Sequence, residues 1–165
     1  MSWGTRIIQG TPYSLRHLDP FLLPVLCGGV GYRVQVAFGA HAFTREVEPG
    51  DTPDLLFMDG NQPRTFSVDR YAHSLHLPAA IAAAVHGDVC LSRNTMVLNT
   101  TLPGLAGPYL VVFNLRAVKG KRFDARLDVR SAHHRPNLDP SLPRAKFQVV
   151  VANVINGKPI RWSKK

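Results

Sequence analysis

Thirteen glycines and thirteen prolines interrupt this 165-residue chain, and they constrain its fold more than any other feature. Glycine and proline punctuate local structure, so the chain is expected to form many short segments joined by turns rather than long helices. Hydrophobic residues make up 45% of the chain and charged residues 19%, which is ordinary globular usage and excludes a disordered chain. The length predicts a single domain, 1–165.

Several of these segments alternate apolar and polar residues with the period of two that half-buried strands show. The clearest are 32–38 (YRVQVAF), for which 43–47 would be the partner strand, and 127–131 (LDVRS). Two further segments, 109–118 (YLVVFNLRAV) and 147–155 (FQVVVANVI), are apolar on both faces and predict central strands.

One region has helical character instead. Ser67 can cap a helix, Asp69 suits the positive end of its first turn, and 79–85 is alanine-rich before His86-Gly87 ends the run. We therefore predict an α+β fold, a mainly antiparallel sheet with a short helical segment at about 67–87 packed on one face.

The other segments are predicted from their turn residues. Prolines and the Gly28–Gly31 run make 1–31 an irregular N-terminal segment, and 49–66 is expected to be a loop. Asn156-Gly157 is a strong hairpin signal, so 158–162 would return as an edge strand within a basic C-terminal tail, 158–165.

The net charge of +9 is distributed unevenly along the chain. Residues 1–115 hold seven Lys/Arg and eight Asp/Glu, whereas 116–165 hold thirteen and three. Such a concentration of positive charge attracts polyanions: nucleic acid, an anionic membrane or an acidic protein. The alternative is a solvated basic face that only keeps the protein soluble.

The cysteines and the apolar runs predict a cytoplasmic protein. Cys27 and Cys90 do not form a C-x-x-C pair, and two buried thiols in a reducing compartment are favoured over a single disulfide. No run is long enough to cross a bilayer, and 21–30, broken by Pro24 and glycines, does not resemble a signal peptide.

The first candidate site surrounds the end of the strand at 127–131. Arg130, His133 and His134 follow one another there, and Lys146 begins the next predicted strand, which we expect to pair with the first. Metal-free RNA cleavage needs a base near neutral pKa and cations that hold the phosphate. His133 or His134 would be the base, and Arg130 and Lys146 would stabilise the phosphorane. An exposed basic loop that only contacts phosphate is the alternative.

The remaining basic residues of the C-terminal third would contact nucleic acid, with Trp162 either stacking on a base or packing on the sheet. This predicted set comprises Lys119, Lys121, Arg122, Arg126, Arg135, Arg144, Lys158, Arg161, Trp162, Lys164 and Lys165.

Two other clusters could hold a metal, but the residues around them favour ordinary helix and turn positions. His73 and His76 lie i, i+3 with no catalytic zinc frame, and Asp51, Asp54 and Asp59 sit among turn residues. Nucleotide-binding glycine loops and esterase motifs are missing as well. The sequence therefore predicts no cofactor.

Five short stretches resemble a family of small uncharacterised proteins carried on bacterial prophages and integrative elements. They are HAFTREVEPGD (41–51), RTFSVDRY (64–71), SLHLP (74–78), RSAHHR (130–135) and NGKPI (156–160). The resemblance implies a genetic context, in which accessory genes often encode toxins, defence factors or regulators, and it implies no activity. A more distant likeness to small metal-independent ribonucleases of the barnase/RelE kind is architectural only.

These observations predict an accessory protein of a mobile element that binds nucleic acid, RNA in the first instance. They leave open whether it also cleaves RNA as a metal-independent endoribonuclease. The alternative function is a non-enzymatic module that docks an acidic protein through its basic C-terminal face.

Overall fold

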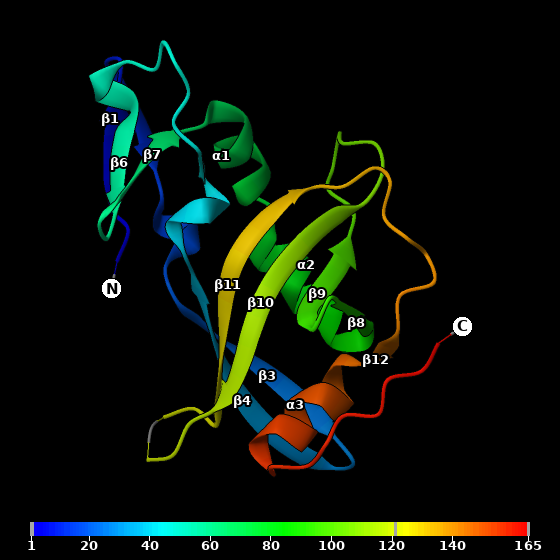
Figure 1. The fold of residues 1–165 in the computed structure, drawn as a ribbon. Helices are drawn as coiled ribbons and strands as arrows, with labels where there is room; N and C mark the ends of the chain where they lie inside the picture. Colours follow the sequence, from blue (N-terminus) through cyan, green and yellow to red (C-terminus); the bar gives the residue numbers. More distant parts are fainter. Residues whose placement is uncertain (1, 121, 165) are drawn as a thin grey trace.

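A computed structural model describes residues 2–120 and 122–164 (Figure 1). A seven-stranded sheet forms most of the molecule, in the strand order β12-β8-β9-β10-β11-β4-β3. Its strands are β3 (Phe21–Cys27), β4 (Val30–Phe38), β8 (Asp88–Ser92), β9 (Thr95–Thr100), β10 (Tyr109–Ala117), β11 (Ala125–His134) and β12 (Arg144–Lys146).

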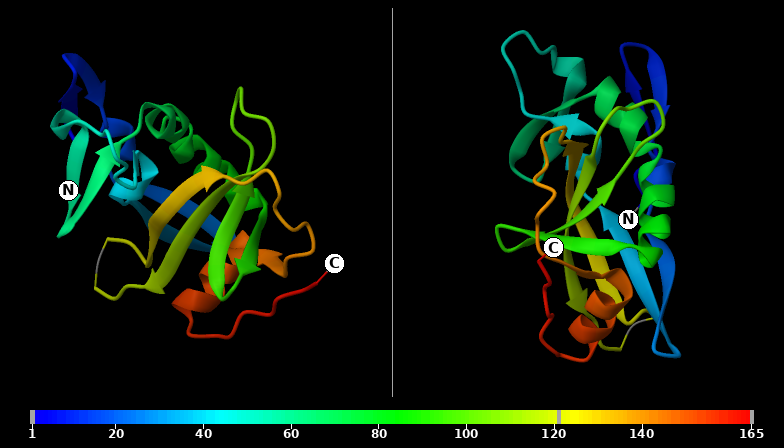
Figure 2. Two further views of the ribbon diagram at one scale, coloured as in Figure 1. Left: turned by 45° about the horizontal axis from the view of Figure 1, so that its top comes forward. Right: turned by 90° about the vertical axis from the view of Figure 1, so that its right-hand side faces the viewer.

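Two smaller β-structures lie at one end of the large sheet (Figure 2). One is a hairpin of β1 (Thr5–Ile8) and β2 (Thr11–Ser14). The other is a three-stranded sheet in the order β5-β7-β6, built from β5 (Thr44–Arg45), β6 (Leu56–Asp59) and β7 (Gln62–Phe66). The expected loop at 49–66 is therefore wrong, because Gly60 and Asn61 turn a hairpin between β6 and β7.

Most pairs in the large sheet are antiparallel, as predicted. Among the described strands, β4 and β11 form the one parallel pair, in which Gln35 lies beside Arg126 and Phe38 beside Val129. Parallel neighbours need a long connection, and here it consists of the whole chain from 39 to 124. The pairing brings the end of β4 next to the middle of β11.

The helical segment agrees with the prediction. It consists of α1 (Val68–Ser74), α2 (Leu77–Ala83) and a 3₁₀ turn, Ala84–His86. Ser67 caps α1, because its hydroxyl accepts a hydrogen bond from the Arg70 backbone N–H at 3.3 Å. The α+β fold class is confirmed.

The predicted strand at 147–155 is wrong, because these residues form α3 (Phe147–Ile155). Its β-branched side chains favour a strand, but Phe147, Val150 and Val151 are buried at helical spacing and Val149 is exposed. The helix contacts β3, β10, β11 and β12, so it lies inside the curl of the sheet.

The predicted hairpin at Asn156-Gly157 is also wrong, since these residues end α3. The Gly157 N–H donates to the Val154 carbonyl at 3.3 Å, and the Lys158 N–H donates to the Asn153 carbonyl at 2.8 Å. Gly157 has a φ of +64°, which completes a Schellman cap. Residues 158–162 do not form the expected edge strand, and the tail regains β contact only at Ser163, opposite Arg144.

The prediction that 1–31 is an irregular segment is wrong. It contains β1, β2 and the whole of β3, and Gly28-Gly29 form the two-residue turn between β3 and β4, with φ of +58° and +80°. Pro24 is tolerated because β3 is an edge strand of the sheet.

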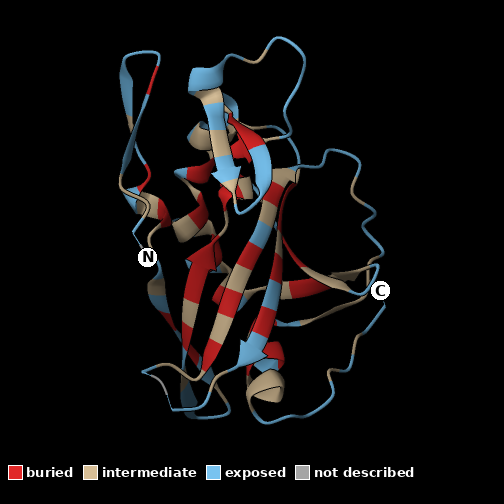
Figure 3. Cartoon of the chain, turned by 60° about the vertical axis from the view of Figure 1, so that its left-hand side comes forward, coloured by how far each residue is buried: buried red, intermediate tan, exposed pale blue. Residues whose placement is uncertain are grey.

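Burial alternates along the strands of the large sheet (Figure 3). On β11, Ala125, Leu127 and Val129 are buried in the core, while Arg126 and Asp128 lie on the outer face. At the end where the small sheet lies, aromatic rings form a second cluster: Trp3, Tyr13, Phe43, Phe57, Phe66 and Tyr71. The outer face of β11 and the small sheet together enclose the site described next.

Candidate functional site

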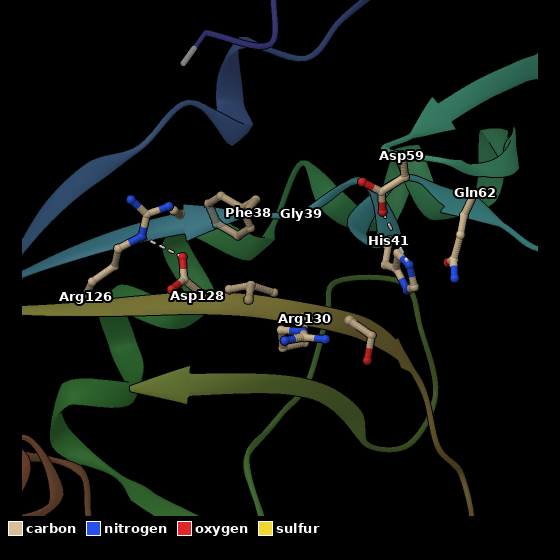
Figure 4. A pocket seen from close by; sticks show the side chains of 11 residues that line it. Phe38, Gly39, His41, Asp59, Gln62, Arg126, Asp128 and Arg130 are labelled. Carbon is tan, nitrogen blue, oxygen red and sulfur yellow. Dashed lines mark hydrogen bonds and ion pairs between the residues drawn. The ribbon is translucent and has the colours of Figure 1, made fainter. Parts of the chain in front are cut away.

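An open groove of about 590 Å³ lies where the outer face of β11 meets the end of β4 and the small sheet (Figure 4). One wall is β11, and the other is formed by the 3₁₀ turn Ala40–Ala42 and the β6–β7 hairpin. The described residues that line it are Ala37, Phe38, Gly39, His41, Asp59, Gln62, Arg126, Asp128, Val129, Arg130 and Ser131.

The β11 wall contains a β-bulge at Arg130. Ser131 pairs with Val112 of β10 and Val129 pairs with Phe113, which leaves Arg130 without a partner on that strand. A bulge shifts the alternation of side chains, so that two successive residues, Arg130 and Ser131, both line the groove. Arg130 lies on the groove side because it continues the alternation of Arg126 and Asp128, and the bulge adds Ser131 to the same side.

The charges on this wall are partly neutralised. Arg126 Nε lies 2.6 Å from Asp128 Oδ1, and Arg116 Nε lies 3.7 Å from Asp128 Oδ2. Arg130 is exposed and forms no ion pair with the residues that the structure describes. It is thus the cation of this wall whose charge is left for a ligand.

The opposite wall carries a histidine and a carboxylate. His41 Nε2 lies 3.6 Å from Asp59 Oδ2, and the two side chains are 36% and 43% exposed. His41 is fixed through its backbone, since Arg70 Nη1 donates to its carbonyl oxygen at 3.2 Å and to that of Thr44 at 3.0 Å. In Figure 4, His41, Asp59 and Gln62 face β11 across the groove.

Arginines from three elements surround His41. Burial is the main cause that lowers the pKa of His41, and Arg64, Arg70 and Arg130 lower it further, while Asp59 raises it. Arg64 is itself 7% exposed, and its Nε donates to Thr44 Oγ1 at 2.7 Å. The imidazole is therefore neutral at pH 7, in a positive environment suited to an anionic ligand.

Residues 5–155 match the model of the protein family described as the YjaZ family. The chain belongs to the YjaZ family. Comparisons with curated proteins and with solved structures gave no match. The match covers both walls of the groove in this YjaZ protein.

The groove contains only part of the predicted catalytic set. Arg130 lines it, but His133 and His134 lie beyond the bulge and do not. Arg126, which was predicted to contact nucleic acid, lines it as well. His134 Nε2 donates to the Ala106 carbonyl at 2.5 Å, so its proton holds the loop before β10. His133 is half-buried, and burial, then Arg135 and Arg70, lower its pKa.

Lys146 does not lie beside β11, and the expected pairing of the two strands is wrong. Lys146 is in β12, which pairs with β8, and three strands separate β12 from β11. Lys146 Nζ lies 2.9 Å from Asp88 Oδ1, and Arg144 Nη1 lies 3.9 Å from Asp88 Oδ2. These two cations are thus bound to a carboxylate of the protein itself.

The other predicted basic residues are distributed over several segments of the fold. Lys119 and Arg122 are exposed in the connection between β10 and β11, and Arg135 is exposed after β11. Exposed positions of the tail are occupied by Lys158, Arg161 and Lys164, and Trp162 packs against the core. Lys121 and Lys165 lie outside the described residues.

Sequence reasoning missed His41 and Gln62 and gave Asp59 a different role. The signals available were a turn after the predicted strand 32–38 and a second turn inside the predicted loop 49–66, but only the folded chain brings both turns to β11. Of the other two aspartates, Asp51 accepts hydrogen bonds from Arg45 and Thr65 and is therefore a structural group. No cluster of three metal-ligating side chains occurs in the part of the chain that the structure describes.

Two further predictions concerned the state of the cysteines and the presence of membrane-spanning segments. Cys27 and Cys90 are free thiols, and Cys90 is buried. None of the described helices has the length and apolar character needed to span a bilayer.

Proposed function

We propose that this protein binds single-stranded RNA in the groove, chiefly through backbone phosphates. The observation that carries the proposal is Arg130, which is exposed, has no ion pair among the described residues and lines the groove. A guanidinium presents a planar set of donors that matches a phosphate, and charge-assisted hydrogen bonds of this kind are the strong ones.

The surroundings of Arg130 also favour a polyanion. Arg126 lies on the same wall, and Arg64 and Arg70 lie close enough to His41 to influence its ionisation. Phe38 is the aromatic residue among the described lining and is 7% exposed, so little base stacking is available. Binding through phosphates with little stacking is strongly dependent on salt and weakly dependent on sequence.

RNA is favoured over DNA by the neutral and acidic groups around the cations. Gln62, Ser131 and Asp59 all line the groove, and each offers an oxygen that can accept a hydrogen bond from a ribose 2′-hydroxyl. This hydroxyl is the group by which a protein distinguishes RNA from DNA. Docking of an acidic protein would use the same arginines but not these acceptors.

The proposal includes a genetic context and a cellular compartment for this function. The resemblance of five short stretches to prophage and integrative-element proteins favours an accessory role in a mobile element. The two free thiols support a reducing, cytoplasmic compartment.

The experiment is a titration of a fluorescein-labelled single-stranded oligoribonucleotide, followed by anisotropy at several salt concentrations. Arg130→Ala should weaken binding by about tenfold or more, because a charge-assisted hydrogen bond contributes roughly 1.5–3 kcal/mol. It should also reduce the salt slope by about 0.7, the contribution of one phosphate contact in a single strand.

The matched control is Arg161→Ala, which removes the same charge from an exposed position in the tail. Affinity should remain within about twofold of wild type, because one remote charge is largely screened. Equal losses in the two variants would mean that net charge, and not the groove, attracts RNA. Polyglutamate that competes as well as unlabelled RNA would indicate an acidic protein as the partner.

A further inference from the structure

His41 is held rigidly at the edge of the groove. It lies in the 3₁₀ turn Ala40–Ala42, directly after β4, and Arg70 fixes its backbone carbonyl. The Thr44 hydroxyl donates to the Ala40 carbonyl at 2.7 Å and closes the same turn. A backbone held in this way fixes the position from which the imidazole projects, and catalysis requires such a positioned group.

Asp59 distinguishes the two ring nitrogens. Its Oδ2 faces Nε2 at 3.6 Å, so the tautomer with a proton on Nε2 is favoured and Nδ1 is left as the proton acceptor. The separation is longer than a hydrogen bond, as is common for catalytic pairs without substrate. A base oriented by a carboxylate and facing a cation across a groove is the arrangement needed for proton abstraction beside a phosphate.

We infer that His41 is the general base of a metal-independent RNA cleavage reaction in this groove, with Asp59 as its positioning residue and Arg130 as the phosphate-binding cation. This inference rests on the proposed binding of RNA.

The reaction balances without a cofactor. The 2′-hydroxyl oxygen forms a bond to the adjacent phosphorus while its proton passes to Nδ1 of His41. The bond from phosphorus to the 5′-oxygen breaks, and that oxygen takes a proton from water, which reaches the open groove. The products are a 2′,3′-cyclic phosphate and a free 5′-hydroxyl, and His41 then releases its proton to solvent.

The charges facing His41 suit this role. The facing groups are Asp59 from β6, Arg64 from β7, Arg70 from α1 and Arg130 from β11. Because burial and the three arginines lower the pKa of His41, the ring is neutral and able to accept a proton at pH 7. Of these arginines, Arg130 lines the groove and would stabilise the negative charge that builds up on the phosphate oxygens.

The test incubates the full chain with a labelled single-stranded oligoribonucleotide in the presence of EDTA and identifies the product ends by mass spectrometry. Cleavage with 2′,3′-cyclic phosphate ends is expected, and the deoxyribonucleotide of the same sequence should stay intact because it lacks the nucleophile. His41→Gln should lower the rate by about 10²-fold or more, the usual contribution of a general base. Asp59→Asn should lower the rate less and should change its pH profile.

Two histidine variants serve as controls. His86→Ala alters an exposed histidine in the turn after α2 and should leave the rate unchanged. His133→Ala should cleave at nearly the wild-type rate, because His133 does not line the groove. A His41→Gln protein that has lost its circular dichroism spectrum would be replaced by Asp59→Asn, whose pH profile then decides.

The two proposals fail separately. RNA that binds in an Arg130-dependent manner but is not cleaved would overturn the role of His41 and leave the binding function intact. Cleavage that needs a divalent metal, leaves 3′-hydroxyl ends or persists in His41→Gln would also overturn it. RNA that does not bind at all would overturn both.

Discussion

Two basic regions of this protein differ in what their cations contact. At the β12 edge, Lys146 and Arg144 both lie within 4 Å of Asp88, so the protein supplies its own anion. In the groove, Asp128 neutralises Arg126 and Arg116, while Arg130 forms no ion pair with the described residues. Both regions belong to the same charge-rich third of the sequence, and only the contacts of the folded chain separate them. A count of positive residues is therefore a poor guide to where a polyanion binds.

Reversing one charge in each region should give the largest contrast. Arg130→Glu places a carboxylate in the groove and should weaken RNA binding by at least about tenfold. Lys146→Glu should change the affinity by less than about twofold, because Lys146 already pairs with Asp88. It should instead lower the melting temperature, since two carboxylates would then face each other. Anisotropy titrations and thermal unfolding of both variants measure this, and a larger loss of affinity in Lys146→Glu would reverse the comparison.

Removing the Asp128 carboxylate should strengthen RNA binding, whereas the change at Arg130 weakens it. Asp128→Asn keeps the size of the side chain but releases Arg126 and Arg116 from their anion. RNA affinity should then rise by about threefold or more at low salt, and the salt slope should steepen. The same titration measures this effect, and an unchanged affinity would mean that Arg126 does not reach the phosphates.

Removing the carboxylate of the β12 edge should do little to RNA binding. Asp88→Asn leaves Arg144 and Lys146 without their ion pairs, far from the groove in the order of strands. The free energy of unfolding should fall by about 1 kcal/mol or less, as for other partly exposed pairs. Chemical denaturation measures this loss. A gain in RNA affinity as large as that of Asp128→Asn would show that both regions bind RNA.

Acidification should lower the melting temperature through the groove and not through the β12 edge, and this effect is the smallest of the four. Burial lowers the pKa of His17, His41 and His133 in the folded protein, so the unfolded chain binds more protons below its own pKa of about 6.5. Stability from these groups is present above that pH and is lost as the pH falls from 7 to 5. His41→Gln should reduce the drop in melting temperature over this range, whereas Asp88→Asn should leave it unchanged, because its cluster contains no histidine. An equal drop in wild type and His41→Gln would contradict the shift at His41.

The sequence predicted those parts of the fold that depend on local pattern. The strand β11 follows from a period of two and β10 from a run that is apolar on both faces. The helices α1 and α2 follow from Ser67 as a cap and from the alanine-rich run. It failed at α3, because a short run rich in valine is compatible with either structure until its packing partners are known. It also failed at Asn156-Gly157, because a glycine with positive φ serves a helix end as well as a hairpin.

In the candidate site, too, local pattern predicted some residues and tertiary pairing decided the others. Arg126 and Arg130 were found because they lie on the polar side of an alternating strand. Lys146 was misplaced because order along the chain was taken for order in the sheet. His41 and Asp59 were missed because they meet β11 only through a parallel pairing between segments more than eighty residues apart.

That parallel pairing has a consequence for the way the protein matures. The β4 wall is synthesised by residue 38, but its neighbour β11 begins only at residue 125. Closing so long a loop is slow, because its entropic cost precedes any contact that offsets it. A nascent chain that has not yet emerged past β11 therefore has no groove, and the protein can engage its ligand there only after β11 has been synthesised.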